Sequence, residues 1–395
     1  MKLFQKLLLT PAVLGLFAPI AASASEANLM DVSSYSQVDV EVTQDTFKPL
    51  TNVNPLLAGG EGLGQSSSDF DGDTFSSTTS AAFTADTLFG ATNGVSDETT
   101  KFIFQYGIEL TTSFTGNDSL DVVIESGNAG SLLSEADFAS TTKQELVIDS
   151  ISYTTLLGER LTLLVGTGTS GSALYAKSCA YQGVSNTMDD CGVAVTNLDE
   201  GLGTTFAGNF DLGAGFSLAF GLEAEDSEKG LLTDEGTDAY GAQIAYTADN
   251  YGVAIGFSSI ENHGTVSEVE NTATGGVTTS TSISAYLEPD IDNIPSISVG
   301  FESTHDDNAA TATDEFSHYF LGIQWDDFGE GILGAAVGSK APYREDKDAE
   351  TMYEIFYAYN YADGITITPA IYVKENAANN TDDETGLFLK TSFSF

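Results

Sequence analysis

Residues 238–259 read DAYGAQIAYTADNYGVAIGFSS, and the alternation within this stretch decides the fold class. Apolar side chains recur at every second position on both sides of the short sequence Ala-Asp-Asn at residues 248–250. They are Tyr240, Ala242, Ile244 and Tyr246 before these residues and Tyr251, Val253, Ile255 and Phe257 after them. A period of two residues is typical of a β-strand, and two such runs around a short turn predict a β-hairpin.

The same unit recurs from about residue 73 to the end of the chain. Short turns are predicted near residues 115–119, 158–160, 211–215, 248–250, 289–294, 326–331 and 361–364. The hairpins around them supply about 14 strands, and one strand at each end of this region brings the total to about 16. Short turns alternate with long loops, the longest at about residues 169–203. In the strand near 145–156, Leu146 and Ile148 have the opposite parity to Ile151 and Tyr153, which predicts a β-bulge.

The faces opposite the apolar stripes carry small or mildly polar residues instead of charged ones. Examples are Gly241, Gln243, Ala245, Gly252, Ala254, Gly256, Ser282, Ser284, Ser296, Ser298, Gly334 and Ala336. Solvent-facing sheet surfaces usually carry Lys and Glu, whereas here nearly all charge lies in the long loops. The pattern predicts an all-β fold, a transmembrane antiparallel β-barrel of about 16 strands with long extracellular loops and short periplasmic turns. A soluble two-sheet sandwich is the alternative.

The two ends of the chain predict where the protein is exported and how the chain divides into segments. Residues 1–24 have two lysines, an apolar run and a small-residue cleavage pattern, which predict a signal peptide. Residues 25–72 are predicted as a periplasmic arm or linker, and 73–395 as the barrel. The chain ends on an alternating strand, GLFLKTSFSF, that must pair with the first strand if the barrel is to close.

The charge excludes some partners. The formal net charge is −45, from 13 Lys and Arg against 58 Asp and Glu, so nucleic acid is not an expected partner. The only cysteines, Cys179 and Cys191, are predicted to form a disulfide in the exported chain.

Several stretches resemble the cyanobacterial outer-membrane porins of the OprB-like, carbohydrate-selective porin superfamily. They are the leader MKLFQKLLLTPAVLGLFAPIAASA, the first strand TFSSTTSAAFTAD, GIELTTSFTGNDSL, AYGAQIAYTADNYGVAIGFSS and ITITPAIYV with LFLKTSFSF. The resemblance implies an outer-membrane location, contact with lipid and lipopolysaccharide, a homotrimer, and recognition of Phe393 and Phe395 by the outer-membrane assembly machinery. The chain departs from the family in two ways. It lacks the usual surface-layer-homology segment. Sugar-selective relatives are associated with arginines at the constriction, whereas the only arginines here, Arg160 and Arg344, lie outside the predicted constriction.

Three other motifs give only weak evidence for a binding or catalytic site. Gly166, Gly168 and Gly171 have dinucleotide-fingerprint spacing, but no helix is predicted after them. Asp69, Asp71 and Asp73 resemble part of a calcium loop whose twelfth position is Ser80 instead of Glu, which favours a solvated linker. The three histidines, His263, His305 and His318, show no catalytic or metal-binding spacing.

The longest loop is predicted to fold into the barrel and narrow it. Its carboxylates and those on inward strand positions would then favour cations. The predicted residues are Asp189, Asp190, Asp199 and Glu200 in the loop, and Glu109, Asp121, Glu125, Glu302 and Glu354 in strands. These features predict a non-enzymatic porin without a cofactor, a passive channel for small hydrophilic solutes such as inorganic ions, iron species or carbohydrates. A non-conducting structural or adhesive barrel, or a secreted β-sandwich that binds a ligand, are the other classes left open.

Overall fold

A computed structural model describes most of the barrel region of the chain. The described residues are 79–95, 98–128, 135, 142, 144–192, 198, 203–225, 227, 230–231, 237–262, 276–291, 293–306, 315–340, 350–375 and 382–395. The predicted signal peptide, the predicted arm and the calcium-like Asp69, Asp71 and Asp73 lie outside them. Within the described residues, no helix has the length and apolarity that crossing a membrane requires.

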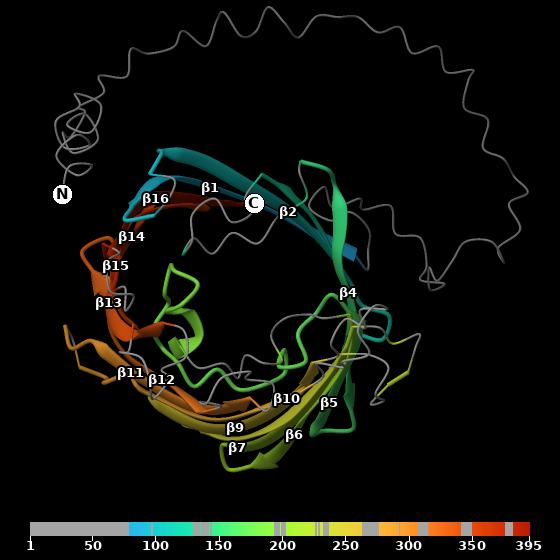
Figure 1. Ribbon diagram of the computed structural model, residues 1–395. Helices are drawn as coiled ribbons and strands as arrows, with labels where there is room; N and C mark the ends of the chain where they lie inside the picture. Colours follow the sequence, from blue (N-terminus) through green and yellow to red (C-terminus); the bar gives the residue numbers. More distant parts are fainter. Residues whose placement is uncertain are drawn as a thin grey trace, which may run out of the picture. The chain divides into compact units, whose positions relative to one another are not determined.

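Sixteen antiparallel strands close into one barrel (Figure 1). They are β1 (Thr79–Asn93), β2 (Lys101–Thr112), β3 (Asp118–Gly127), β4 (Val147–Leu157), β5 (Leu161–Thr167), β6 (Thr204–Gly213), β7 (Phe216–Ala224), β8 (Asp238–Thr247), β9 (Tyr251–Asn262), β10 (Gly276–Leu287), β11 (Ser296–Asp306), β12 (Glu315–Phe328), β13 (Gly331–Lys340), β14 (Glu350–Ala362), β15 (Ile365–Lys374) and β16 (Glu384–Ser394). Each strand pairs with its neighbours in the sequence, and β16 pairs with β1. The predicted fold class and strand number are therefore confirmed.

The chain terminus seals the barrel. β1 and β16 pair over ten positions, from Thr84 opposite Ser394 to Asn93 opposite Thr385. Beyond this ladder, Phe83 and Phe395 exchange two backbone hydrogen bonds of 2.8 and 3.0 Å. Their rings stack with centroids 5.7 Å apart. The last residue is thus part of the seam, because an open strand edge would leave its peptide groups without partners.

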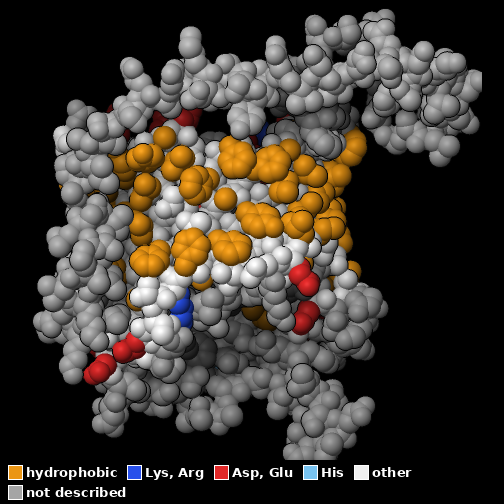
Figure 2. Space-filling view, turned by 90° about the horizontal axis from the view of Figure 1, so that it is seen from above, with side chains coloured by type: hydrophobic (Ala, Val, Ile, Leu, Met, Phe, Trp, Pro, Cys, Tyr) orange, Lys and Arg blue, Asp and Glu red, His pale blue; other side chains and the backbone are white. Residues whose placement is uncertain are grey.

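Alternate side chains of each strand point to the outside and to the inside of the barrel. In β8, Tyr240, Ala242 and Ile244 are exposed, whereas Gly241 and Gln243 are buried on the inner side. Large apolar side chains are exposed on the outer surface, and on the face seen in Figure 2 they gather in a band. A band of this kind matches the hydrocarbon layer of a membrane in its chemistry.

A bulge accounts for the change of parity in β4. Val123 pairs with Ser150 and Ile124 pairs with Ile148, so Asp149 is left without a partner in the ladder. The extra residue lets the apolar side chains on both sides of it point outwards.

Candidate functional site: the inner loop and the open wall of the lumen

The connection between β5 and β6 lies inside the barrel. We call it the inner loop; it comprises residues 168–203, of which 168–192, 198 and 203 are described. Figure 1 shows this green segment within the ring of strands. A short 3-10 helix within it, η2 (Asp189–Gly192), contacts β11 and β12. The described part of the loop therefore covers one wall of the barrel interior and leaves another open.

Inward polar side chains hold the first part of the inner loop by its backbone. The hydroxyl of Thr205 in β6 donates to the carbonyl of Thr169. Glu223 in β7 accepts a 2.6 Å hydrogen bond from the Gly171 amide, and the Asn209 side chain in β6 donates to the carbonyl of Leu174 at 2.7 Å. These bonds satisfy peptide groups that are shielded from water, so the loop has a defined path along the wall.

Two glutamines pair with the middle of the loop in the manner of a neighbouring strand. Gln243 in β8 accepts from the Ala176 amide at 2.7 Å and donates to its carbonyl at 3.2 Å. Gln324 in β12 accepts from the Gln182 amide at 2.8 Å and donates to the Ala180 carbonyl at 3.1 Å. A side-chain amide suits this role because it carries both a donor and an acceptor.

Ser298 and Glu354 hold the next part of the loop. Ser298 in β11 accepts from the amides of Ala180 and Tyr181, at 2.9 and 3.2 Å. One carboxylate oxygen of Glu354 in β14 accepts from the Tyr181 hydroxyl at 2.8 Å and from the Val184 amide at 3.3 Å. Burial, reinforced by the Glu354 carboxylate, raises the pKa of Tyr181, so the hydroxyl keeps the proton that it donates.

Small inward residues make room for the inner loop. A Cβ on Gly221 in β7 would overlap the backbone carbonyl of Gly171. A Cβ on Gly334 in β13 would overlap the Phe356 ring of β14 and would lie 3.0 Å from the Tyr181 ring of the loop. The sequence interpretation placed such residues around water. On this side of the barrel they instead allow a loop to approach the wall closely.

An apolar cluster lies under the loop, where the sequence predicted a polar lumen. Tyr181 packs between Phe320 of β12 and Phe356 of β14, with ring centroids 5.4 and 5.6 Å away. Other buried inward members are Met188 of the loop, residues of β14, β15 and β16, and one residue each of β1 and β2: Met352, Tyr372, Phe388, Leu88 and Ile103. The prediction of a uniformly small, polar inner face is therefore wrong for this wall, because the loop shields these side chains from water.

The far end of the loop is held by a disulfide and by contacts with Glu135, which in turn reaches β15. A disulfide joins Cys179 to Cys191. Residues Asn186 and Thr187, which we call the tip, bind Glu135 from the β3–β4 connection. Glu135 in turn lies 3.7 Å from the ammonium group of Lys374 in β15. Sequence reasoning weighed only arginines as lumenal cations, although strand parity alone could have indicated Lys374.

The open wall is formed by inward positions of β1, β2 and β3, apart from the buried Leu88 and Ile103, and is rich in carboxylates. Glu109 is exposed, and Asp86, Asp121 and Glu125 are partly exposed. Glu109 lies opposite Val123, with Asp121 and Glu125 two positions to either side on β3. Such diagonal neighbours are roughly 7–8 Å apart, so these three carboxylates form one patch.

Two cations lie on the same side. Lys101 and Lys390 occupy inward positions of β2 and β16 and are partly exposed. Lys390 is opposite Leu88, two positions from Asp86. On the described part of the open wall, carboxylates therefore outnumber ammonium groups.

The predicted constriction residues separate into three groups. Glu109, Asp121 and Glu125 lie on the open wall. Glu302 and Glu354 occupy inward strand positions but are only 1% and 4% exposed, so their carboxylates do not face open water. Asp189 is partly buried in η2, and nothing is described of the Asp190 side chain or of Asp199 and Glu200.

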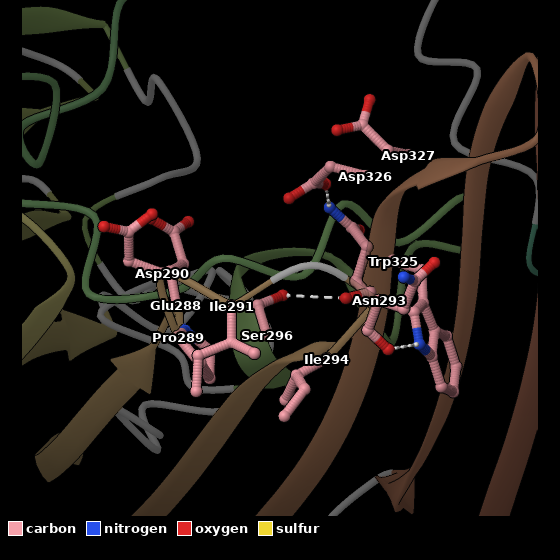
Figure 3. Close-up of a pocket in the computed structure, with 11 residues that line it drawn as sticks. Glu288, Pro289, Asp290, Ile291, Asn293, Ile294, Ser296, Trp325, Asp326 and Asp327 are labelled. Atoms are coloured by element: carbon pink, nitrogen blue, oxygen red, sulfur yellow. Dashed lines mark hydrogen bonds between the residues drawn. The ribbon is translucent and has the colours of Figure 1, made fainter.

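A polar hollow of about 210 Å³ opens at the short-turn end of the barrel, beside the β10–β11 turn (Figure 3). Glu288 and Asp290 line one side of it, and Asp326 and Asp327 the other. Gln324 connects the hollow to the inner loop, because its amide also donates to Asp326 at 2.7 Å. In the described residues, no group of His, Cys, Asp and Glu has an arrangement that could hold a metal ion.

The remaining motifs gain no chemistry from the fold. Gly166 is a paired residue of β5, and Gly168 and Gly171 begin the inner loop, so the glycine spacing belongs to a strand and a wall contact. His305 and His318 lie in β11 and β12, and His263 lies outside the described residues.

Comparisons with solved structures place this barrel among porin folds. The OprB structure of Pseudomonas putida, determined at high pH, matches with a TM-score of 0.58 and 11% identity, over 80% of this chain and 94% of that one. A loop-deletion mutant of OmpT, an outer-membrane protein of Vibrio cholerae, matches with a TM-score of 0.54 and 9% identity, over 80% and 99%. A triple mutant of the Rhodopseudomonas blastica porin gives 0.52 and 15%, over 80% and 100%. No protein-family model and no curated protein matches the chain. At these identities the likeness shows the fold.

Proposed function

We propose that the protein is an outer-membrane porin, a passive diffusion channel for small hydrophilic solutes and ions. The observation that carries the proposal is a closed barrel with an apolar outer band whose interior is narrowed by its own loop and retains an open, charged wall. Passage would follow the wall of β1, β2 and β3, since the opposite wall is covered. The short turns would face the periplasm, and an N-terminal signal peptide would direct export.

We propose a preference for cations because carboxylates dominate the open wall. At about 8 Å in water, a carboxylate attracts a monovalent cation by roughly 0.5 kcal/mol, about twofold in local concentration. Glu109, Asp121 and Glu125 lie in one patch, so their effects combine until salt screens them. Inorganic cations and iron species fit this wall. Carbohydrates are less favoured, because the inward aromatic rings of Phe320, Phe356, Tyr372 and Phe388 are buried.

The test is conductance of the refolded protein in a planar bilayer, with the reversal potential measured under a salt gradient. Stepwise conductance with a cation-sided reversal potential is expected. Replacing Glu109, Asp121 and Glu125 by Gln, Asn and Gln should move the reversal potential towards zero. Glu159→Gln is the matched control, because it removes one exposed carboxylate from the β4–β5 turn.

Each outcome decides between classes. A neutral or anion-sided reversal potential in the wild type would contradict the cation preference but would still support a channel. A folded, inserted barrel without conductance would favour the structural or adhesive alternative. Trimer formation, assembly through Phe395 and contact with lipopolysaccharide belong to the same proposal, and native gels with intact outer membranes would test them.

A further inference from the structure

We propose that Lys374, Glu135 and Glu384 form a latch that fixes the tip of the inner loop and so sets the width of the passage. The inference deepens the proposed function and rests on it for its effect on conduction. The latch itself follows from contacts between three parts of the chain that are far apart in sequence: the β3–β4 connection, the inner loop and the β15–β16 hairpin.

The tip binds Glu135. The Asn186 amide donates to the Glu135 backbone carbonyl at 3.2 Å, and the Thr187 hydroxyl donates to its carboxylate at 2.6 Å. The Glu135 side chain is fully buried. A residue from another loop therefore occupies the interior of the barrel and receives two hydrogen bonds from the tip.

Lys374 connects Glu135 to the barrel wall. Its ammonium group lies 2.8 Å from Glu384, directly opposite it in the β15–β16 ladder, and 3.7 Å from Glu135. The Tyr372 hydroxyl donates to the other Glu384 oxygen at 2.7 Å. Glu384 and Tyr372 thus orient the ammonium group towards Glu135, which makes Lys374 a positioning residue for the tip.

The arrangement predicts which part moves when the latch is broken. Without Lys374, the buried carboxylates of Glu135 and Glu384 lose the ammonium group between them, and removing the cation of a buried ion pair is strongly destabilising. Glu384 is fixed by the strand ladder, whereas Glu135 lies in a connection between strands. Glu135 should therefore leave the interior, and the tip would lose both of its hydrogen bonds to it.

The experiment compares Lys374→Met, Glu135→Gln and the double variant with Lys390→Met. Lys390→Met is the matched control for the hydrogen exchange of the tip, since it removes an inward ammonium group from β16, several positions along the ladder from the Lys374–Glu384 pair. Its own conductance is expected to change with the charge of the open wall, so it is not the reference for conduction. Single-channel recordings should show more frequent closures and a changed conductance in Lys374→Met and Glu135→Gln. If both act through one contact, the double variant should depart from the product of the single effects on closure rate by roughly 2- to 10-fold.

Hydrogen exchange of the Asn186 amide, measured on the folded protein in detergent, gives a readout that does not need conduction. Exchange should accelerate in Lys374→Met and remain unchanged in Lys390→Met. The Ala176 amide, held by Gln243, is an internal reference that should keep its protection. Unchanged Asn186 exchange in Lys374→Met would refute the latch even in a conducting barrel. Accelerated exchange of the Asn186 amide in a barrel that never conducts would support the latch and would refute the proposed channel function.

Discussion

Gly221 gives the sharpest test of how the inner loop is seated. A methyl group at this position would overlap the carbonyl of Gly171, and the obstacle is backbone, so the loop has to move away from β7. Gly221→Ala should therefore break the 2.6 Å hydrogen bond between the Gly171 amide and Glu223. Glu223 is 0% exposed, so its carboxylate would lose a donor that water does not replace.

The expected size follows from that one contact. A hydrogen bond to a charged group contributes roughly 1.5–3 kcal/mol, which corresponds to about a 10- to 100-fold change in the equilibrium between the seated and displaced loop. Hydrogen exchange of the Gly171 amide measures this equilibrium directly. Its protection should fall by that factor in Gly221→Ala, with the strand amides of β6 and β7 unaffected.

Gly208→Ala is the matched control. Gly208 lies opposite Phe220 on the outer face of the same hairpin, and a Cβ there would meet the side chains of Phe220 and Leu163, which can move, and no atom of the inner loop among its nearest neighbours. This variant carries the same backbone effect of Gly→Ala without touching the loop. Equal Gly171 protection in Gly221→Ala and Gly208→Ala would refute the reasoning that small inward residues seat the loop.

Three further predictions concern the loop core and the seam. Tyr181→Phe should destabilise the loop by roughly 1–3 kcal/mol, since it removes a donor from the buried Glu354; an unchanged denaturation curve would contradict this. Because the pKa of Tyr181 is raised above its usual 10.0, its contribution should be fully present below pH 10 and lost only as the pH rises through the raised value. Absorbance at high pH, compared between wild type and Tyr181→Phe, should show no Tyr181 ionisation near its usual pKa. Replacing Cys179 and Cys191 by serine should lower the free energy of unfolding by about 2–3 kcal/mol in urea, and no change would show that the apolar cluster alone fixes the loop. Phe395→Ala removes the ring stacked across the seam and should reduce the heat-modifiable, folded fraction after refolding; an unaltered fraction would make the seam hydrogen bonds sufficient.

The sequence alone determined the strands, their number and their two faces. Alternation is a local property, because successive side chains in a strand point to opposite sides whatever the rest of the chain does. The residues around 240–257 could therefore be assigned to the outside or the inside by parity, and the offset around Asp149 could be recognised as a bulge. The need for a closed edge likewise predicted that Phe395 would meet the first strand.

Only the tertiary structure decided which inward positions meet water. Parity places Glu109 and Glu354 on the same inner face, yet one is exposed and the other is buried under Tyr181, 173 residues away in sequence. Lys374 likewise acquires its role from Glu135, a residue of a different connection. No local pattern records such pairings, because they depend on where a long loop crosses the closed barrel. The sequence thus determines which side chains point into the barrel. The path of the inner loop determines whether each of them faces open water, holds the loop or takes part in the latch.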